Sequence, residues 1–322
     1  MDASELESVL DEGPLFDKEL PPGHRSGFVA LVGKPNVGKS TLLNAWMGTK
    51  LAPVSPKPQT TRDRLLGILT REDAQVLFMD TPGIHRPRTK LGDFMVEAAR
   101  SVLPDADVVV FVIDLTVPPS RADRETAALL ATLSPDVVRI LAMNKMDRVS
   151  EEELENRCAA YEALSDFDHS LCISALLGKG VGELLQVIIV ALPQGPRYYS
   201  EDQLTDRQER FIVAELIREH GMRHLHQEVP HALAVVVREM KKRPNGTMYI
   251  LAHLYVEKES QKGIVIGKNA SMLKAIGHDA RIDLQRFLGG KVYLDLQVRV
   301  RKNWRRDKRA LQQFGYTMGR QV

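Results

Sequence analysis

One eight-residue segment, between residues 33 and 40, restricts the fold of this chain more than any other. It follows the apolar run 28–32, leads into the helical stretch 41–47 and matches the pattern G-x-x-x-x-G-K-[ST]. Its glycines let backbone N–H groups surround a phosphate at a helix start, where the helix dipole favours negative charge. In this pattern Lys39 reaches the β- and γ-phosphates of a nucleotide, and the Ser40 hydroxyl binds Mg²⁺. We therefore expect nucleotide-binding residues at Gly33, Lys34, Pro35, Asn36, Val37, Gly38, Lys39, Ser40 and Thr41.

The segments around this loop indicate a parallel β-sheet. Short runs that are apolar at nearly every position, rather than alternating, recur in the first part of the chain, at 28–32, 76–79, 108–114, 137–143 and 171–173. Such runs are typical of strands that helices cover on both faces. We expect an α/β P-loop domain with a mostly parallel sheet and helices on both faces.

A second motif, Asn144-Lys145-Met146-Asp147, indicates that the nucleotide base is guanine. An aspartate here accepts hydrogen bonds from the ring N–H and the exocyclic amine of guanine, and adenine lacks both of these donors. The motif ends an apolar run, and open α/β sheets bind ligands at that end of their strands. Ser174 and Ala175 end the next run, where a backbone N–H is expected to meet the guanine carbonyl. Asn144 and Asp147 also argue against the alternative of a P-loop kinase or ATPase.

Two further segments are expected to respond to the γ-phosphate. Asp80 follows the run 76–79 and is predicted to hold Mg²⁺ through water. The segment 59–63 supplies hydroxyls, of which we favour Thr61 over Thr60 as a Mg²⁺ ligand, and loops of this kind close around a phosphate and relax when it leaves. We predict that the catalytic residues are Lys39, Thr61 and Gly83 and that the GTP site also includes Asp80, Thr81, Pro82, Gly83 and Ile84.

The charge distribution divides the chain near Gly195. Residues 1–195 hold 20 Lys and Arg against 28 Asp and Glu, a net −8, whereas residues 196–322 hold 24 against 14, a net +10. Such a split suggests that the second part faces a polyanion. We predict an acidic flexible tail (1–26), a nucleotide-binding domain (27–195), a linker (196–204) and an α+β nucleic-acid-binding domain (205–322). In the last, we expect helices over 205–219, over 271–288 and from Asn303 onward, and strands over 231–240, 248–257 and 291–300.

The second domain carries a predicted RNA site. A G-x-x-G loop between two helices clamps single-stranded nucleic acid beside an apolar groove in KH domains, and Gly267-Lys268-Asn269-Ala270 departs from that pattern only at its last position. Seven Lys or Arg residues lie among the eleven residues from 299 to 309 and would neutralise phosphates. Trp304 either packs in the core or stacks on a base. The predicted RNA-binding residues are Ile264, Ile266, Gly267, Lys268, Asn269, Ala270, Lys274, Arg301, Lys302, Trp304, Arg305 and Arg306.

The motifs GKPNVGKS, QTTRD, DTPGI, NKMD and ISA occur in this order, followed by IVIGKNASMLKAIG and KVYLDLQVRVRKNWRRDKRAL. On these motifs, residues 28–192 look like a translation-factor-class GTPase domain, and residues 28–317 resemble the Era family of bacterial GTPases, in the TrmE-Era-EngA-like group. The resemblance implies a C-terminal type II KH domain, binding of 16S rRNA near its 3′ end and a role in small ribosomal subunit assembly. It also implies peripheral association with the cell membrane. Because Asn36 occurs in potassium-dependent relatives, it further implies a K⁺ ion beside the phosphates.

Ile84 leaves two mechanisms open. Many small GTPases have a glutamine at this position to orient the attacking water, and isoleucine offers neither a donor nor an acceptor. We expect slow GTP hydrolysis that depends on other groups. The alternative is a non-hydrolysing protein in which GTP only stabilises an rRNA chaperone.

The remaining composition bounds location and partners. The longest nearly uncharged apolar stretches, 107–113 and 184–192, are shorter than the roughly 20 residues that cross a bilayer. Two cysteines, Cys158 and Cys172, are too few for a disulfide framework, and the nine histidines show no four-ligand zinc pattern. We expect a monomeric cytoplasmic protein whose partners are GTP or GDP and RNA rather than DNA.

Overall fold

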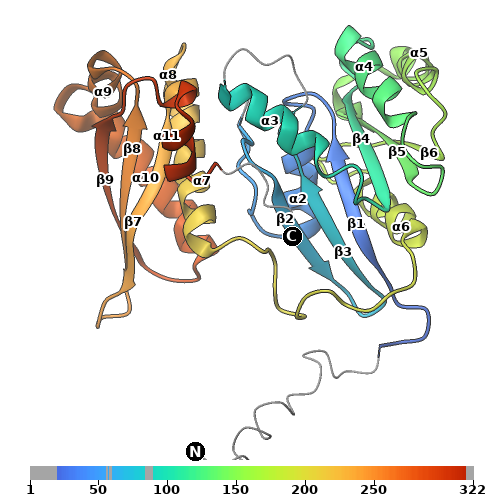
Figure 1. The fold of residues 1–322 in the computed structure, drawn as a ribbon, viewed down its shortest axis with the longest axis horizontal. Helices are drawn as coiled ribbons and strands as arrows, with labels where there is room; N and C mark the ends of the chain where they lie inside the picture. Colours follow the sequence, from blue (N-terminus) through green and yellow to red (C-terminus); the bar gives the residue numbers. More distant parts are fainter. Residues whose placement is uncertain (1–19, 56, 58–59, 84–89, 317–322) are drawn as a thin grey trace, which may run out of the picture.

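The computed structural model describes residues 20–55, 57, 60–83 and 90–316. In the first half, six strands form a sheet in the order β2-β3-β1-β4-β5-β6, in which β2 pairs antiparallel with β3 and the other pairings are parallel. The elements, drawn in Figure 1, are β1 (Arg25–Val32), α2 (Lys39–Met47), β2 (Leu65–Thr70), β3 (Ala74–Asp80), α3 (Lys90–Arg100), β4 (Val108–Asp114), α4 (Arg121–Leu130), β5 (Val138–Asn144), η1 (Met146–Arg148), α5 (Glu151–Glu162), β6 (His169–Cys172) and α6 (Val181–Ala191).

Both faces of this sheet are buried, as the apolar runs predict. In β1, Val29 and Leu31 pack into one core cluster, whereas Ala30 and Val32 pack into the other. Helices α2 and α6 contribute to the first cluster and α4 and α5 to the second. The mostly parallel sheet with helices on both faces is therefore confirmed. Because β1, β4 and β5 are parallel, the loops that follow them meet at one edge of the sheet.

The second half is a smaller α+β unit built on a three-stranded sheet in the order β7-β8-β9. Strand β7 pairs antiparallel with β8, and β8 pairs parallel with β9. In β8, Ile250, Ala252, Leu254 and Val256 alternate with partly exposed residues, so one face of the sheet packs on helices and the other stays open. The elements are α7 (Glu209–His224), α8 (Val229–Ala232), β7 (Ala234–Lys242), β8 (Met248–Val256), α9 (Glu259–Ile266), η2 (Lys268–Ala270), α10 (Ser271–Phe287), β9 (Val292–Val300), η3 (Trp304–Arg306) and α11 (Lys308–Gln313).

Three element boundaries in this half differ from the sequence expectation. The strand expected from His231 begins at Ala234, because Pro230 stands in the first turn of the short helix α8. The helix expected over 205–219 spans Glu209–His224. The helix expected from Asn303 is two short pieces, η3 and α11, and the second begins where the Asp307 side chain accepts a hydrogen bond from the Arg309 N–H.

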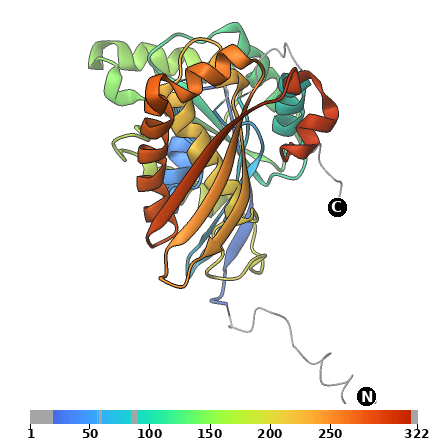
Figure 2. The same ribbon diagram turned by 90° about the vertical axis from the view of Figure 1, so that its left-hand side faces the viewer.

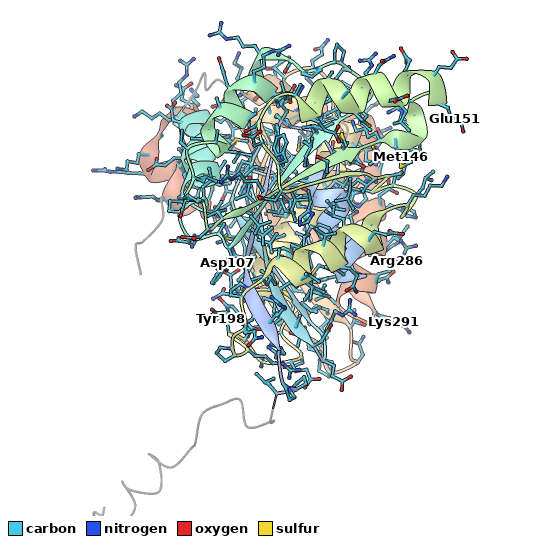
Figure 3. All side chains as sticks on the ribbon, turned by 90° about the vertical axis from the view of Figure 1, so that its right-hand side faces the viewer. Asp107, Met146, Glu151, Tyr198, Arg286 and Lys291 are labelled. Atoms are coloured by element: carbon cyan, nitrogen blue, oxygen red, sulfur yellow. The ribbon has the colours of Figure 1, made fainter. Side chains whose placement is uncertain are left out.

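The segment that connects the two halves lies along the lower edge of the first sheet. The backbone N–H groups of Tyr198 and Tyr199 donate to Gln75 Oε1 over 2.7 and 3.0 Å. The Tyr198 ring packs 5.5 Å from that of Phe28, whose N–H donates to Asp107 Oδ2 over 2.7 Å. Asp107 and Tyr198 lie near each other at this end of the sheet in Figure 3. Strand β1 itself begins at Arg25, two residues inside the predicted tail.

The structure also bears on membrane insertion. In the described ranges, no helix combines the length and the apolar character that a bilayer-spanning segment requires.

Candidate functional site: a nucleotide pocket and an RNA groove

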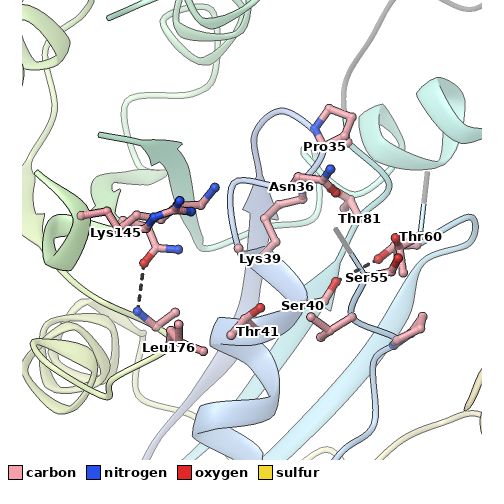
Figure 4. Close-up of a pocket in the computed structure, with 18 of the residues that line it drawn as sticks. Pro35, Asn36, Lys39, Ser40, Thr41, Ser55, Thr60, Thr81, Lys145 and Leu176 are labelled. Carbon is pink, nitrogen blue, oxygen red and sulfur yellow. Dashed lines mark hydrogen bonds between the residues drawn. The ribbon is translucent and has the colours of Figure 1, made fainter. Parts of the chain in front are cut away.

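A cavity of about 490 Å³ lies at the loop edge of the first sheet, a volume typical of small-molecule sites. Lys145 and Leu176 lie on one side of the phosphate loop, and Ser55 and Thr60 lie on the other (Figure 4). The cavity brings together these predicted residues: Pro35, Asn36, Gly38, Lys39, Ser40, Thr41, Thr60, Thr61, Thr81, Gly83, Asn144, Lys145, Asp147 and Ala175. Its lining also includes residues that the sequence did not single out, because they belong to no motif: Pro53, Val54, Ser55, Arg148 and Leu176.

The phosphate loop is held in place by close backbone approaches. A Cβ atom at Gly38, where φ is +109°, would lie 2.1 Å from Asn144 Nδ2. A Cβ atom at Gly83 would lie 2.4 Å from the backbone nitrogen of Pro35. Both positions therefore need glycine, and the second brings the segment after β3 directly against the phosphate loop.

Lys39 lies beneath this loop, where its ammonium can meet phosphate oxygens. Its Nζ donates to the carbonyl oxygens of Gly33 and Lys34, each over 2.9 Å, and the side chain is buried. Burial lowers the Lys39 pKa to about 8, against the opposing charge of Asp80. An anionic ligand would add negative charge beside this buried ammonium and so favour its charged form.

Three oxygen-bearing side chains converge at the base of the loop. The Ser40 hydroxyl donates to Asp80 Oδ2 over 2.7 Å and lies 2.9 Å from the Thr61 hydroxyl. The second carboxylate oxygen, Asp80 Oδ1, is buried and has no hydrogen-bond partner among the described residues. Burial raises the pKa of Asp80, although the charge of Lys39 opposes this. A hard divalent cation fits this donor set, because it would bind hydroxyl oxygens and satisfy the buried carboxylate.

Asn144 connects the guanine-side loops to the phosphate loop. Its Nδ2 donates to the Val37 carbonyl over 2.7 Å, and its Oδ1 accepts from the Ala175 N–H over 2.9 Å. Lys145 forms an ion pair with Asp114 over 2.5 Å, while Asp147 lines the cavity. Asn144 therefore connects its own loop to those of Val37 and Ala175. Asp147 faces the cavity, where a ligand can reach it.

Several predicted residues point away from the cavity. Lys34 forms an ion pair with Asp123 over 2.7 Å, and Ser174 is buried. Val37 is a core residue and Met146 packs against the other core cluster. Gly33 and Pro82 are described but are not part of the cavity lining, and Ile84 lies outside the described residues.

The loop before β2 is bound to the second half of the chain. The Arg218 guanidinium, on α7, donates to the Thr60 carbonyl. Arg62 is 1 % exposed, and its guanidinium donates to the carbonyl oxygens of Leu233, Pro230 and His231 over 2.7, 3.3 and 3.1 Å. Thr61, between them, faces Ser40. The predicted Mg²⁺ ligand thus lies between two residues that contact the second domain, an arrangement that no sequence motif indicated.

A groove of about 340 Å³ runs between α10 and β9 and contains part of the predicted RNA site. Its lining includes Ala270, Lys274, Arg281 and Tyr293. Ala270 has φ +58°, so it adopts the left-handed conformation that glycine takes at lower cost. Lys268, within the Gly267–Ala270 loop, and Ile264, just before it, are exposed. Arg305 is held by an ion pair with Glu257 over 2.5 Å, and Arg301 lies 3.8 Å from Asp307.

The prediction that Trp304 contacts RNA was wrong. Its side chain is fully buried, its Nε1–H donates to the Ala232 carbonyl over 2.9 Å, and its ring stacks on Tyr316 at 6.1 Å. The Arg62 guanidinium lies 5.6 Å from the same ring. The neighbouring cations in the sequence suggested that Trp304 is exposed. In the structure it is instead buried in a separate apolar cluster with residues of α3 and α11.

Trp304→Phe is therefore expected to reduce stability and to leave RNA affinity unchanged. The smaller ring leaves a void and removes the donor to the Ala232 carbonyl, at a cost of about 2 kcal/mol in the free energy of unfolding. Urea unfolding followed by circular dichroism measures this cost. A loss of RNA affinity in fully folded protein, with unchanged stability, would restore the stacking role.

A phosphate loop, an NKxD motif and an oxygen site for a divalent cation, on a mostly parallel sheet, define a P-loop GTPase. A family model described as "50S ribosome-binding GTPase" matches residues 28–145, and a KH domain model matches residues 228–305. GTPase Era of Carboxydothermus hydrogenoformans is 46% identical over 295 residues, covering 91% of this chain and 98% of that protein. GTPase Era of Geotalea uraniireducens is 48% identical over 292 residues, covering 91% and 98%. The chain belongs to the Era family of GTPases.

Solved structures of that family have the same fold. A crystal structure of Era in complex with MgGDPNP and nucleotides 1506-1542 of 16S ribosomal RNA aligns with a TM-score of 0.85 at 38% identity. It covers 91% of this chain and 99% of that one. A variant of Aquifex aeolicus Era bound to GDP.AlF4- aligns with the same score, identity and coverage. The second half of the chain is accordingly a KH domain.

Proposed function

We propose that this protein is a GTP-hydrolysing switch that binds 16S rRNA near its 3′ end through its KH domain and assists small-subunit assembly. The proposal rests on the two contacts of the segment Thr60–Arg62. Thr61 contacts the Ser40 hydroxyl of the predicted Mg²⁺ site, and its two neighbours form buried hydrogen bonds with the KH domain. The RNA seen with the related Era supports the choice of ligand. For the domains we retain the division into 27–195 and 205–322.

In the proposed mechanism, the residues of the pocket bind and orient GTP. Lys39 would contact the β- and γ-phosphates, and the Ser40 and Thr61 hydroxyls, together with the Asp80 carboxylate through water, would hold Mg²⁺. The bound ion supplies positive charge to the oxygens that become more negative during phosphoryl transfer. Gly83 lies against the phosphate loop, where its N–H would meet the γ-phosphate. Asp147 selects guanine. Loss of the γ-phosphate weakens the interactions that hold Thr61 at the site. The contacts of the neighbouring Thr60 and Arg62 with the KH domain then shift.

The test of this function is RNA affinity in two nucleotide states. A short RNA with the 16S 3′-end sequence is titrated with protein loaded with a non-hydrolysable GTP analogue or with GDP, across a salt series. We expect the GTP-state protein to bind about tenfold more tightly, or about 1.4 kcal/mol. A difference of twofold or less, about 0.4 kcal/mol, would contradict the switch. Single-turnover hydrolysis with and without RNA separates the switch from the alternative of a non-hydrolysing, GTP-stabilised rRNA chaperone.

We further propose that a potassium ion beside the phosphates replaces the catalytic glutamine. Ile84 provides no polar group, while Asn36 lines the pocket beside the phosphate loop, as in the potassium-dependent relatives. Replacing K⁺ by Na⁺ at constant ionic strength is expected to reduce turnover about tenfold, equal to about 1.4 kcal/mol of activation free energy. Equal turnover in the two salts, at saturating GTP and Mg²⁺, would refute the role of K⁺.

For location we propose a monomer of the cytoplasm that also contacts anionic lipid peripherally. The basic charge of residues 196–322 supports the lipid contact, because it suits any polyanionic surface. Co-sedimentation with vesicles containing phosphatidylglycerol, compared with neutral vesicles, tests it. Equal recovery with both vesicle types would exclude an electrostatic contact.

A further inference from the structure

The open face of the KH sheet carries an aromatic pair at one end. Lys241, Tyr249 and Tyr293 are partners across β7, β8 and β9, so their side chains stand in one row. The two tyrosine rings lie 5.9 Å apart at an angle of 22°, and Tyr293 is 54% exposed. Figure 2 shows the three strands side by side, with the β7–β8 hairpin at their lower end.

An arginine from the hairpin joins this pair. The Arg243 guanidinium lies 4.6 Å from the centre of the Tyr249 ring and 4.8 Å from that of Tyr293. Lys241 lies 5.6 Å from the Tyr249 ring. The guanidinium therefore lies over both tyrosine rings, and these three side chains together form a platform at the surface of the sheet. Tyr293 nevertheless remains 54% exposed, whereas a cross-strand aromatic pair that only stabilised the sheet would gain by burial.

The charge of this face suits a polyanion. Outward-facing side chains of the sheet and its hairpin include four cations, Arg238, Lys241, Arg243 and Arg299, and two carboxylates, Glu239 and Asp295. Glu239 is paired with Lys241 over 2.5 Å, and Asp295 accepts a hydrogen bond from the Tyr249 hydroxyl over 3.5 Å. Burial, and then the charges of Arg238 and Arg299, lower the pKa of His253 in the middle of the face.

The platform is continuous with the groove. Tyr293 and Asp295 line the α10–β9 groove as well as the edge of the open face. A chain that leaves the groove across β9 therefore meets Tyr293 first, and Arg243 and Tyr249 next. At the other end of the sheet the path is closed, because Phe314 packs 4.7 Å from the Tyr255 ring.

We propose that Tyr249, Tyr293 and Arg243 form a second RNA-binding site, which stacks the bases of single-stranded RNA that continue from the groove. This inference rests on the proposed RNA-binding function and extends it to a particular surface. Base stacking on tyrosine suits any sequence, since every base has an aromatic face, and the arginine adds a stacking or phosphate contact. The site therefore adds affinity and length to the RNA bound, rather than base specificity.

The experiment compares two RNA lengths on the full chain. One labelled RNA has about four nucleotides, enough to fill the groove, and the other is about twice as long. The double variant Tyr249→Thr/Tyr293→Thr removes both rings and introduces β-branched residues, which suit strands. We expect it to lose about tenfold or more in affinity for the long RNA, with unchanged affinity for the short one. Tyr249→Phe/Tyr293→Phe keeps the rings and is expected to bind both RNAs like the unchanged protein.

Each failure has a distinct result. If the unchanged protein binds neither RNA, the proposed function fails. If it binds both and the threonine variant loses nothing, or loses the same factor for both lengths, the second site is refuted. If the threonine variant unfolds, the variant Arg243→Gln replaces it. In addition, 5-iodouridine is placed in the long RNA, at the positions beyond the groove, and photocrosslinked to the unchanged protein. Crosslinks to Tyr249 or Tyr293 support the site, and crosslinks confined to groove residues refute it.

Discussion

Asp147→Asn is expected to change the nucleotide preference from GTP to xanthosine triphosphate. Asp147 lines the cavity, where we propose that its carboxylate accepts two hydrogen bonds from guanine. An amide at this position turns one acceptor into a donor that faces the guanine amine, so affinity for GTP should fall about a thousandfold, or about 4 kcal/mol. Xanthine has a carbonyl in place of that amine and accepts from the new amide. Titration with fluorescent analogues of both nucleotides measures the change.

The matched control is Asp136→Asn, the same chemical change on an exposed residue that contacts only Ser134 among the hydrogen bonds described. We expect it to leave both affinities unchanged. Asn144→Ala is not a suitable control, because Asn144 holds the Val37 and Ala175 loops together. If Asp147→Asn kept its preference for GTP, the base would be recognised elsewhere, and the assignment of the guanine site would be wrong.

The nucleotide-binding fold could be predicted from the sequence because its evidence is local. Strand, glycine loop and helix are adjacent in the chain between Arg25 and Met47, and the largely apolar strands indicate a sheet covered on both faces. The parallel order then brings the loops of Ser40, Asp80 and Asp147 to one edge without any further information. The antiparallel β2 was not foreseen, because a single short strand carries no sign of its direction.

The contacts between the domains could not be predicted in the same way. Arg62 bonds to carbonyl oxygens 168 to 171 residues away, and Arg218 bonds to Thr60 158 residues away. No pattern in a single sequence pairs such residues, and a charged residue is ordinarily expected at the surface. The prediction for Trp304 was wrong for the same reason. Cations surround it in the sequence, whereas in the structure it packs in an apolar cluster. The sequence could therefore indicate the residues of the nucleotide pocket but not the contacts between the two domains.

Arg62→Met is expected to disconnect the two sites. Its guanidinium bonds to three carbonyl oxygens of the KH domain and lies over the Trp304 ring. Methionine fills much of the space but leaves these carbonyls without their donor, which should cost about 3–5 kcal/mol of the free energy of unfolding. Arg62→Lys keeps the charge and should recover only part, because an ammonium cannot reach all three oxygens. Urea unfolding, followed by the fluorescence of Trp304 in the KH domain and of Trp46 in the GTPase domain, reports where stability is lost.

The effect of Arg62→Met on RNA binding tests the switch more directly than its effect on stability. The GTP pocket contains neither Arg62 nor its partners, so Arg62→Met should bind GTP normally, while its RNA affinity should differ by less than twofold between the GTP and GDP states. Arg71→Met is the matched control, because it makes the same change at an arginine that is 38% exposed and pairs with Asp73 within the first domain, over 3.4 Å. An exposed contact is worth less than about 1 kcal/mol, so this variant should keep the difference between nucleotide states. If Arg62→Met also kept that difference, the coupling would run through other contacts, such as Arg218 with Thr60.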